Sequence, residues 1–162
     1  MDKPAIYKFL EQRHIWHEIT EHPAVYNMAD LTKIDIPYRA VEVKNLFLHD
    51  DKKRNYYLIS VKGDKRVNLK QFRKDNGTRP LSFASEQSLL DILSLQPGSV
   101  TPLGLLNDTA RKVHYFIDQT LLDQPGLIGV HPNENTATVW LKSQDLIDLI
   151  REHGNEVTVA KL

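Results

Sequence analysis

The stretch that most constrains the fold is residues 40–61, AVEVKNLFLHDDKKRNYYLISV, where two runs of strand-forming residues flank a charged turn. The pattern predicts a β-hairpin with strands Val41–Leu48 and Asn55–Val61 and a turn at His49–Arg54. Lys44 lies inside the first strand, among apolar neighbours that predict burial on both faces. An ammonium there needs a charged partner, a solvated cleft or an edge position from which its stem reaches water. The hairpin alone leaves a structural and a functional role for Lys44 open.

Helical periodicity and capping residues predict five helices, at Lys3–Arg13, Met28–Lys33, Asn68–Lys74, Glu86–Leu95 and Gln144–His153. The expected N-caps are Asp2 for the first of these helices, Asn27 for the second, Ser85 for the fourth and Ser143 for the fifth. Further strands are predicted at Trp16–Thr20, Leu81–Ala84, Lys112–Asp118, Leu127–His131, Thr136–Leu141 and Val157–Lys161. Several strands follow one another without an intervening helix. This order favours an α+β fold, with a mixed, curved or barrel-like sheet flanked by helices, in one domain over residues 1–162.

Composition excludes several classes of protein. The 21 basic residues balance the 21 acidic ones, so no overall charge attracts DNA or a membrane surface. The absence of cysteine excludes disulfides, thiolate nucleophiles and cysteine metal sites. No apolar run approaches the roughly 18–20 residues that cross a bilayer, and the N-terminus lacks the apolar core of a signal peptide. We expect a soluble cytoplasmic protein.

The common catalytic signatures are also absent. The seven histidines show no HExxH-type spacing, so no metal site is predicted. Neither a glycine-rich phosphate loop nor a GxSxG elbow occurs, and nothing implies a cofactor.

Three constrained corners remain as candidates. Gly98–Pro102, GSVTP, lies in a predicted loop over Pro97–Asp108, and its N–H groups could face a developing oxyanion. An ordinary connection between elements is the alternative. His131, in the corner Gly129–Pro132, could hold a substrate amine, shape a pocket or occupy a surface turn. His22-Pro23 is a third corner with the same alternatives.

Basic residues also concentrate within one span of an otherwise neutral chain. They are Lys52, Lys53, Arg54, Lys62, Lys65, Arg66, Lys70, Arg73, Lys74 and Arg79. Asp64 and Asp75 are the acidic residues of the same span. The span could form a phosphate-binding surface, or it could be the solvated face of a helix and a hairpin.

Taken together, these segments resemble the YbaK-type prolyl-tRNA editing family, which is related to the editing domain of bacterial prolyl-tRNA synthetase. The matching segments run in one order over nearly the whole chain: HPAVY (22–26), VKNL (43–46), YYLISVKGDKRVNLK (56–70), LSFAS (81–85), PGSVTPLGLLND (97–108) and HPNENTATVWL (131–141). The sequence departs from the family pattern in two places, at Asn27–Asp30 and at Asn133-Glu134.

The resemblance implies an aminoacyl-tRNA deacylase that needs no metal and no cofactor. It places the family's essential lysine at Lys44 and its substrate loop at Gly98–Pro102. The backbone of Gly98 would bind the ester carbonyl oxygen, and Lys44 would anchor the tRNA 3′ end or stabilise negative charge. The other residues expected to bind substrate are Asn45, Ser99, Val100, Thr101, Pro102, Gly129, His131 and His22.

The expected substrate is Ala-tRNA(Pro), because a site built for proline cannot exclude the smaller alanine by size. A Cys-tRNA(Pro) deacylase is the nearest alternative. A module that binds tRNA or a synthetase without hydrolysis is an alternative from another class. The implied partners are the 3′ end of a mischarged tRNA(Pro) and prolyl-tRNA synthetase, with no DNA and no membrane.

Overall fold

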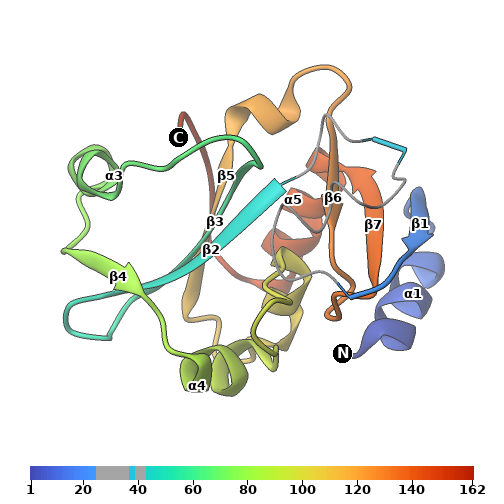
Figure 1. Ribbon diagram of the computed structural model, residues 1–162, viewed down its shortest axis with the longest axis horizontal. Coiled ribbons are helices and arrows are strands. Elements are labelled where there is room, and N and C mark those ends of the chain that lie inside the picture. The colour runs from blue at the N-terminus through green and yellow to red at the C-terminus, as the bar shows by residue number, and fades with distance from the viewer. Residues whose placement is uncertain (25–36, 39–42) are drawn as a thin grey trace.

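The computed structural model describes residues 1–24, 37–38 and 43–162, which form two sheets with helices around them (Figure 1). The larger sheet has five strands in the order β4-β2-β3-β5-β8, and the smaller has three in the order β1-β7-β6. The predicted α+β class with a mixed sheet is confirmed. Both sheets are open rather than closed into a barrel over the described residues.

The larger sheet contains the hairpin that the sequence predicted. Its strands are β2 (Val43–Asp50), β3 (Tyr56–Lys62), β4 (Leu81–Phe83), β5 (Val113–Asp118) and β8 (Val157–Ala160). Strand β2 pairs antiparallel with β3 and β4, whereas β5 pairs parallel with β3 and β8. The smaller sheet is antiparallel and consists of β1 (His17–Glu21), β6 (Leu127–Val130) and β7 (Ala137–Lys142).

The helices are α1 (Lys3–Gln12), α3 (Leu69–Asn76), α4 (Glu86–Ser88) and α5 (Ser143–His153), with shorter turns η2 (Leu89–Leu93), η3 (Pro102–Asn107) and η4 (Gln119–Leu122). Two predicted N-caps, Asp2 and Ser85, are confirmed, and Asn68, predicted as the first residue of its helix, is a third N-cap. The side chains of Asp2, Asn68 and Ser85 accept hydrogen bonds from the backbone N–H groups of the first turns of α1, α3 and α4. Each cap satisfies a donor that the helix itself leaves unpaired.

Three details of the predicted elements were wrong. Ser143 does not cap α5, because its hydroxyl donates to the Leu121 carbonyl at 2.6 Å and Lys142 occupies the cap position. The helix predicted over Glu86–Leu95 is one α-helical turn that continues as the π-helical η2. The second half of the predicted loop is the 3₁₀ helix η3. The predicted helix Met28–Lys33, its cap Asn27 and the departure at Asn27–Asp30 lie outside the described residues.

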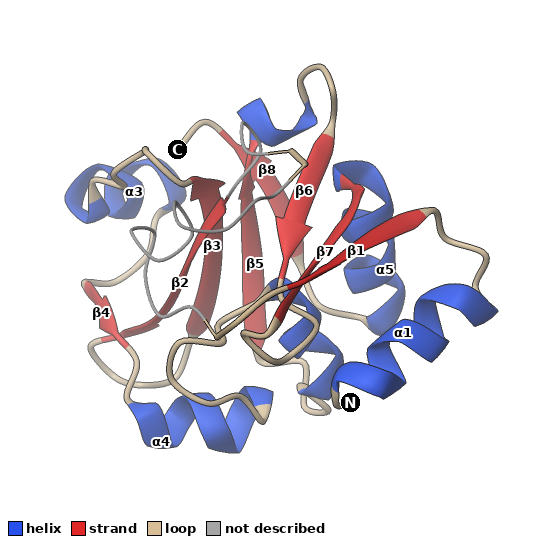
Figure 2. Ribbon diagram, turned by 45° about the vertical axis from the view of Figure 1, so that its right-hand side comes forward, coloured by secondary structure: helices blue, strands red, loops and turns tan. Residues whose placement is uncertain are grey.

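Two apolar clusters fill the two faces of the larger sheet. The main core packs residues of β2, β3 and β5 against α1, α5, η3 and the smaller sheet, and the second packs the opposite face against Phe72 of α3. In Figure 2, α1 and α5 accordingly lie on the side of the smaller sheet, and α3 lies at the other end of the larger one. No helix in the described part of the chain is long and apolar enough to cross a membrane.

The Lys44 end of β2 is less buried than the sequence suggested. Strand β4 pairs with β2 at Leu48–Asp50, and Lys44 lies four residues before this paired segment. Phe47 and Leu48 are buried, whereas Lys44 and Leu46 are half-buried. The prediction of burial on both faces therefore holds for the far half of the strand and fails at the lysine.

Candidate functional site

The segment Gly98–Pro102 begins with a tight turn. The Ser99 N–H donates to the Gln96 carbonyl at 3.1 Å, and Gly98 has φ of 85°, the left-handed conformation that a type II turn requires after Pro97. The turn uses the Ser99 N–H, so this group is not available to a ligand. The N–H groups of Gly98 and Val100 donate to no acceptor in the described part of the chain.

Thr101 joins this loop to the His131 corner. Its side chain is fully buried, and its hydroxyl donates to the His131 carbonyl oxygen at 2.7 Å. The Thr101 hydroxyl oxygen also accepts the Leu103 N–H at 3.3 Å, which makes Thr101 the N-cap of η3. Pro102 occupies the first position of that helix, where its missing N–H costs nothing, and it is buried there. The loop and the corner are therefore one connected unit.

Asn45 connects the loop to the larger sheet. Its side-chain Nδ2 donates to the Val100 carbonyl oxygen at 3.3 Å, and its Oδ1 accepts a hydrogen bond from the Ser60 hydroxyl. Ser60 in turn accepts a hydrogen bond from the Tyr115 hydroxyl at 2.7 Å. The predicted substrate residues Asn45 and Val100 thus contact each other directly, across 55 residues of sequence.

The His131 ring keeps one nitrogen available as an acceptor. Its Nδ1 lies 3.1 Å from the Ala137 carbonyl oxygen, which can only accept, so Nδ1 carries the hydrogen. Burial lowers the pKa of His131, and the nearby His22 acts in the same direction, while the hydrogen bond to Ala137 opposes them. The imidazole is therefore neutral at pH 7, and its Nε2 has a lone pair that contacts no donor in the described residues.

His22 lies beside His131 and is held from both sides. Its Nδ1 donates to the Pro23 carbonyl at 2.9 Å, so its Nε2 accepts the Thr138 hydroxyl, also at 2.9 Å. The His22 and His131 rings meet edge to face with their centroids 6.4 Å apart. The ring contact joins the His22-Pro23 corner to the His131 corner. The hydrogen bond from Thr101 to His131 joins the Gly98–Pro102 loop to the same two corners.

Gly129 has a packing role in the smaller sheet. A Cβ atom at this position would lie 2.4 Å from the Trp140 ring, which covers the Gly129 backbone. Trp140 is buried, packs edge to face on Tyr38 at 5.4 Å and donates its indole N–H to Thr20. Within the described residues, Gly129 makes no hydrogen bond to Asn45, Thr101 or His131 and pairs with Trp140 instead.

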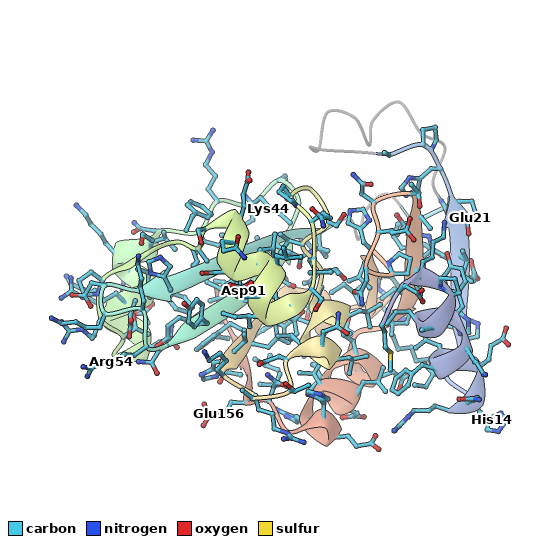
Figure 3. The ribbon with its side chains drawn as sticks, turned by 90° about the horizontal axis from the view of Figure 1, so that it is seen from below. His14, Glu21, Lys44, Arg54, Asp91 and Glu156 are labelled. Carbon is cyan, nitrogen blue, oxygen red and sulfur yellow. The ribbon has the colours of Figure 1, made fainter. Side chains whose placement is uncertain are left out.

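Lys44 projects from the face of β2 opposite to Asn45. Cα partners in an antiparallel pair project from the same face, and Lys44 pairs with Val61 of the second apolar cluster, whereas Asn45 pairs with Ser60. The Lys44 ammonium makes no ion pair or hydrogen bond with a described residue. Figure 3 shows Lys44 at the end of β2 away from the hairpin turn that carries Arg54.

The basic span divides into paired and unpaired residues. Arg79 makes two hydrogen bonds to Asp51, at 2.6 and 2.9 Å, and Lys65 contacts the buried Asp118 at 2.7 Å. The other basic residues of the span make no ion pair with a described residue, and most are exposed, in the hairpin turn and on α3. Within the described residues, no three histidine, aspartate or glutamate side chains are grouped as metal ligands would be.

Sequence reasoning missed the residues behind the site. Ser60, Tyr115 and Thr138 are buried side chains that hold Asn45 and His22. One signal was available, because Ser60 is a lone small polar residue within the apolar run YYLISV. A buried hydroxyl needs a partner, but the sequence does not say which one.

Comparison with known proteins identifies the family. The family model "Aminoacyl-tRNA editing domain" matches residues 22–149. The chain belongs to the aminoacyl-tRNA editing domain family. The prolyl-tRNA editing protein ProX of Acetoanaerobium sticklandii is 38% identical over 160 residues, which cover 99% of this chain and 97% of ProX. The mouse prolyl-tRNA synthetase associated domain-containing protein 1 is 32% identical over 154 residues, which cover 91% of this chain and 90% of that protein.

Solved structures share the fold at lower identity. A proposed trans-editing enzyme for prolyl tRNA synthetase superposes with a TM-score of 0.69 at 21% identity, covering 99% of this chain and 96% of that one. The hypothetical protein APE2540 gives the same TM-score at 17% identity, covering 95% and 97%. The YbaK and ProX type of family, expected from the sequence motifs, is confirmed.

Proposed function

We propose that this protein is a trans-editing hydrolase that acts in the cytoplasm and cleaves the aminoacyl ester of mischarged Ala-tRNA(Pro). The observation that carries the proposal is the connected unit of Asn45, the Gly98–Pro102 loop and the His131 corner. It combines N–H donors and an imidazole acceptor that have no partner among the described residues. Membership of the editing family and the name of the ProX relative support the same substrate class.

The backbone N–H groups of Gly98 and Val100 are the proposed donors to the ester carbonyl oxygen. Hydrolysis of an ester places negative charge on that oxygen, and donors fixed before the reaction stabilise it without reorganisation. The Ser99 N–H is excluded from this role, because it already closes the turn with Gln96. The proposed oxyanion site is therefore narrower than the whole loop that the sequence suggested.

The His131 Nε2 is the proposed acceptor for the α-amino group of the substrate. Neutral imidazole with hydrogen on Nδ1 offers a lone pair at Nε2, and every amino acid ester carries N–H groups that can donate to it. The Pro23 carbonyl and the Thr138 hydroxyl fix the neighbouring ring of His22. This contact would hold the backbone of any aminoacyl group, so the discrimination among amino acids must come from the volume around the side chain.

Lys44 has an electrostatic role in this proposal. Since its side chain leaves β2 on the face opposite to Asn45, we place its ammonium at a phosphate of the tRNA 3′ end rather than at the reacting carbonyl. Two unit charges 4 Å apart attract by about 1 kcal/mol in water and about 4 kcal/mol at a protein surface. The described residues hold no general base beside Lys44, and we propose that the ribose hydroxyl of the terminal nucleotide activates the water.

The preference for alanine follows the logic of a second sieve. A synthetase site for proline discriminates against a smaller side chain by only about 1–3 kcal/mol per missing methylene, so a separate pocket must admit alanine and reject proline. Cysteine is close to proline in size, which makes Cys-tRNA(Pro) the alternative substrate of the same chemistry. The name of the mouse relative supports prolyl-tRNA synthetase as a proposed partner.

The test compares deacylation of Ala-, Cys-, Ser- and Pro-charged tRNA(Pro) by the parent, Lys44→Ala and the matched control Lys142→Ala. Lys142 is an exposed lysine at the end of β7, in the smaller sheet, whereas β2 belongs to the larger one. We expect the parent to hydrolyse Ala-tRNA(Pro) fastest and to spare Pro-tRNA(Pro). Lys44→Ala should lose at least tenfold in kcat/KM, and Lys142→Ala should stay within twofold of the parent.

Two results would change this conclusion. Faster hydrolysis of the Cys ester than of the Ala ester would transfer the proposal to the alternative substrate. If no ester is hydrolysed faster than in buffer, the enzyme proposal fails. Weaker tRNA binding by Lys44→Ala would then favour a binding module.

A further inference from the structure

A series of three hydrogen-bonded side chains crosses the larger sheet and ends at the Gly98–Pro102 loop. It runs from Tyr115 on β5 through Ser60 on β3 to Asn45 on β2, and Asn45 contacts the Val100 carbonyl. Tyr115 and Ser60 are fully buried, while Asn45 is half-buried. The series therefore starts in the core and emerges at the candidate site.

The donors and acceptors of this series can be arranged in one direction. The Tyr115 hydroxyl donates to Ser60, and burial, which the hydrogen bond with Ser60 only partly offsets, raises the pKa of this phenol and keeps it protonated. Ser60, having accepted that hydrogen, donates its own to Asn45 Oδ1. The Asn45 amide must then turn its NH₂ group toward the Val100 carbonyl oxygen.

We propose that Ser60 and Tyr115 are positioning residues that fix the rotation of the Asn45 amide, so that its second N–H is presented to the substrate. An amide nitrogen carries two hydrogens, and the Val100 carbonyl takes one of them. The opposite rotation would place Oδ1 against the Val100 oxygen and the NH₂ group against the Ser60 hydroxyl. The inference rests on the proposed function only for the identity of the acceptor, an oxygen atom of the aminoacyl-tRNA 3′ end.

The test uses Ser60→Ala and Tyr115→Phe, each with a matched control. Ser143→Ala removes an equally buried serine hydroxyl that donates to the Leu121 carbonyl, outside the candidate site. Tyr57→Phe removes the hydroxyl of a tyrosine on the neighbouring strand whose residue is largely buried and whose hydroxyl makes no hydrogen bond to a described residue. Because Ser60 and Ser143 are matched in burial and in hydrogen bonding, a general loss of stability should affect that variant and its control alike.

Two measurements decide the proposal. In ¹⁵N–¹H spectra, the Asn45 side-chain NH₂ signals should shift or broaden in Ser60→Ala and remain at the parent positions in both controls. In deacylation assays, Ser60→Ala should lower kcat about tenfold with KM changed less than threefold. Tyr115→Phe should lower kcat by a smaller factor than Ser60→Ala does. Adding Ser60→Ala to Asn45→Ala should cause no further loss, because the amide that Ser60 positions is gone.

Unchanged Asn45 amide signals in Ser60→Ala would overturn the proposal, as would a loss of kcat no larger than in Ser143→Ala. If the parent hydrolyses no aminoacyl-tRNA at all, the proposed function fails. The positioning of Asn45 is then still decided by the NH₂ signals, which need no substrate.

Discussion

The hydroxyl of Thr101 offers the sharpest test of how the candidate site is held together. Thr101→Val keeps the shape of the side chain and removes the oxygen that bonds both the His131 carbonyl and the Leu103 N–H. Thr101→Ser keeps the oxygen and removes one buried methyl group. The pair therefore separates the hydrogen bonds from the apolar packing at a single, fully buried position.

The magnitudes follow from what each variant leaves behind. Thr101→Val leaves the His131 carbonyl and the Leu103 N–H without their partner. At about 1–2 kcal/mol for each group, the free energy of unfolding should fall by about 2–4 kcal/mol. Thr101→Ser should cost about 1 kcal/mol for the lost methyl group. In a chain of 162 residues, 1 kcal/mol lowers Tm by about 2–4 °C. We therefore expect Tm to fall by about 4–16 °C in Thr101→Val and by about 2–4 °C in Thr101→Ser.

Calorimetry and deacylation assays check this prediction together. Thr101→Val should also reduce kcat/KM for Ala-tRNA(Pro) at least tenfold, because the loop loses its connection to the His131 corner, whereas Thr101→Ser should stay within about threefold. If Thr101→Ser proves the more destabilised variant, the methyl group rather than the hydroxyl holds the loop, and the reasoning fails. Equal activity of the two variants would show that this connection does not serve catalysis.

Three further predictions concern the surrounding structure. Gly129→Ala should cost about 1–3 kcal/mol and change the fluorescence of Trp140, because the new Cβ would meet its ring at 2.4 Å; an unchanged emission spectrum would contradict this packing. Lys65→Gln should cost about 2–3 kcal/mol at pH 7, since it removes the partner of the buried Asp118 carboxylate. Burial raises the pKa of Asp118, but hydrogen bonds from Lys65 and Thr120 outweigh it and hold the pKa below its usual value. Denaturant titrations should therefore show that Lys65→Gln costs less stability as the pH falls and the Asp118 carboxylate becomes protonated. Because the pKa of His131 is lowered in the folded state, the stability that the neutral ring contributes is present above about pH 6.5 and is lost on acidification. The free energy of unfolding should therefore fall more in the parent than in His131→Gln between pH 7 and 5. Parallel plots of that free energy against pH would refute this.

Local chemistry made much of this fold predictable. The capping side chains of Asp2 and Ser85 contact backbone groups only three residues away, so the sequence alone indicates them. The same holds for the turn at Gly98, where proline and glycine in succession favour a single turn type. The prediction for Ser143 failed because a serine can also donate to a distant carbonyl, here that of Leu121.

Residues distant in sequence decided the site itself. Motifs placed Lys44 and Asn45 side by side, but strand pairing sends their side chains to opposite faces of β2, and that pairing depends on β3. The contact of Asn45 with Val100 spans 55 residues, and that of Thr101 with His131 spans 30.

The sequence by itself determined the elements, the family and the residues that draw attention, because these depend on short-range patterns and on motif order. Tertiary structure decided which of those residues share a site. It joined Asn45, Thr101 and His131, placed Lys44 on the face of β2 opposite to Asn45, and packed Gly129 against the Trp140 ring. The physical reason is that a hydrogen bond requires its two atoms within about 3 Å, and only the packed sheets bring residues from distant segments to that distance.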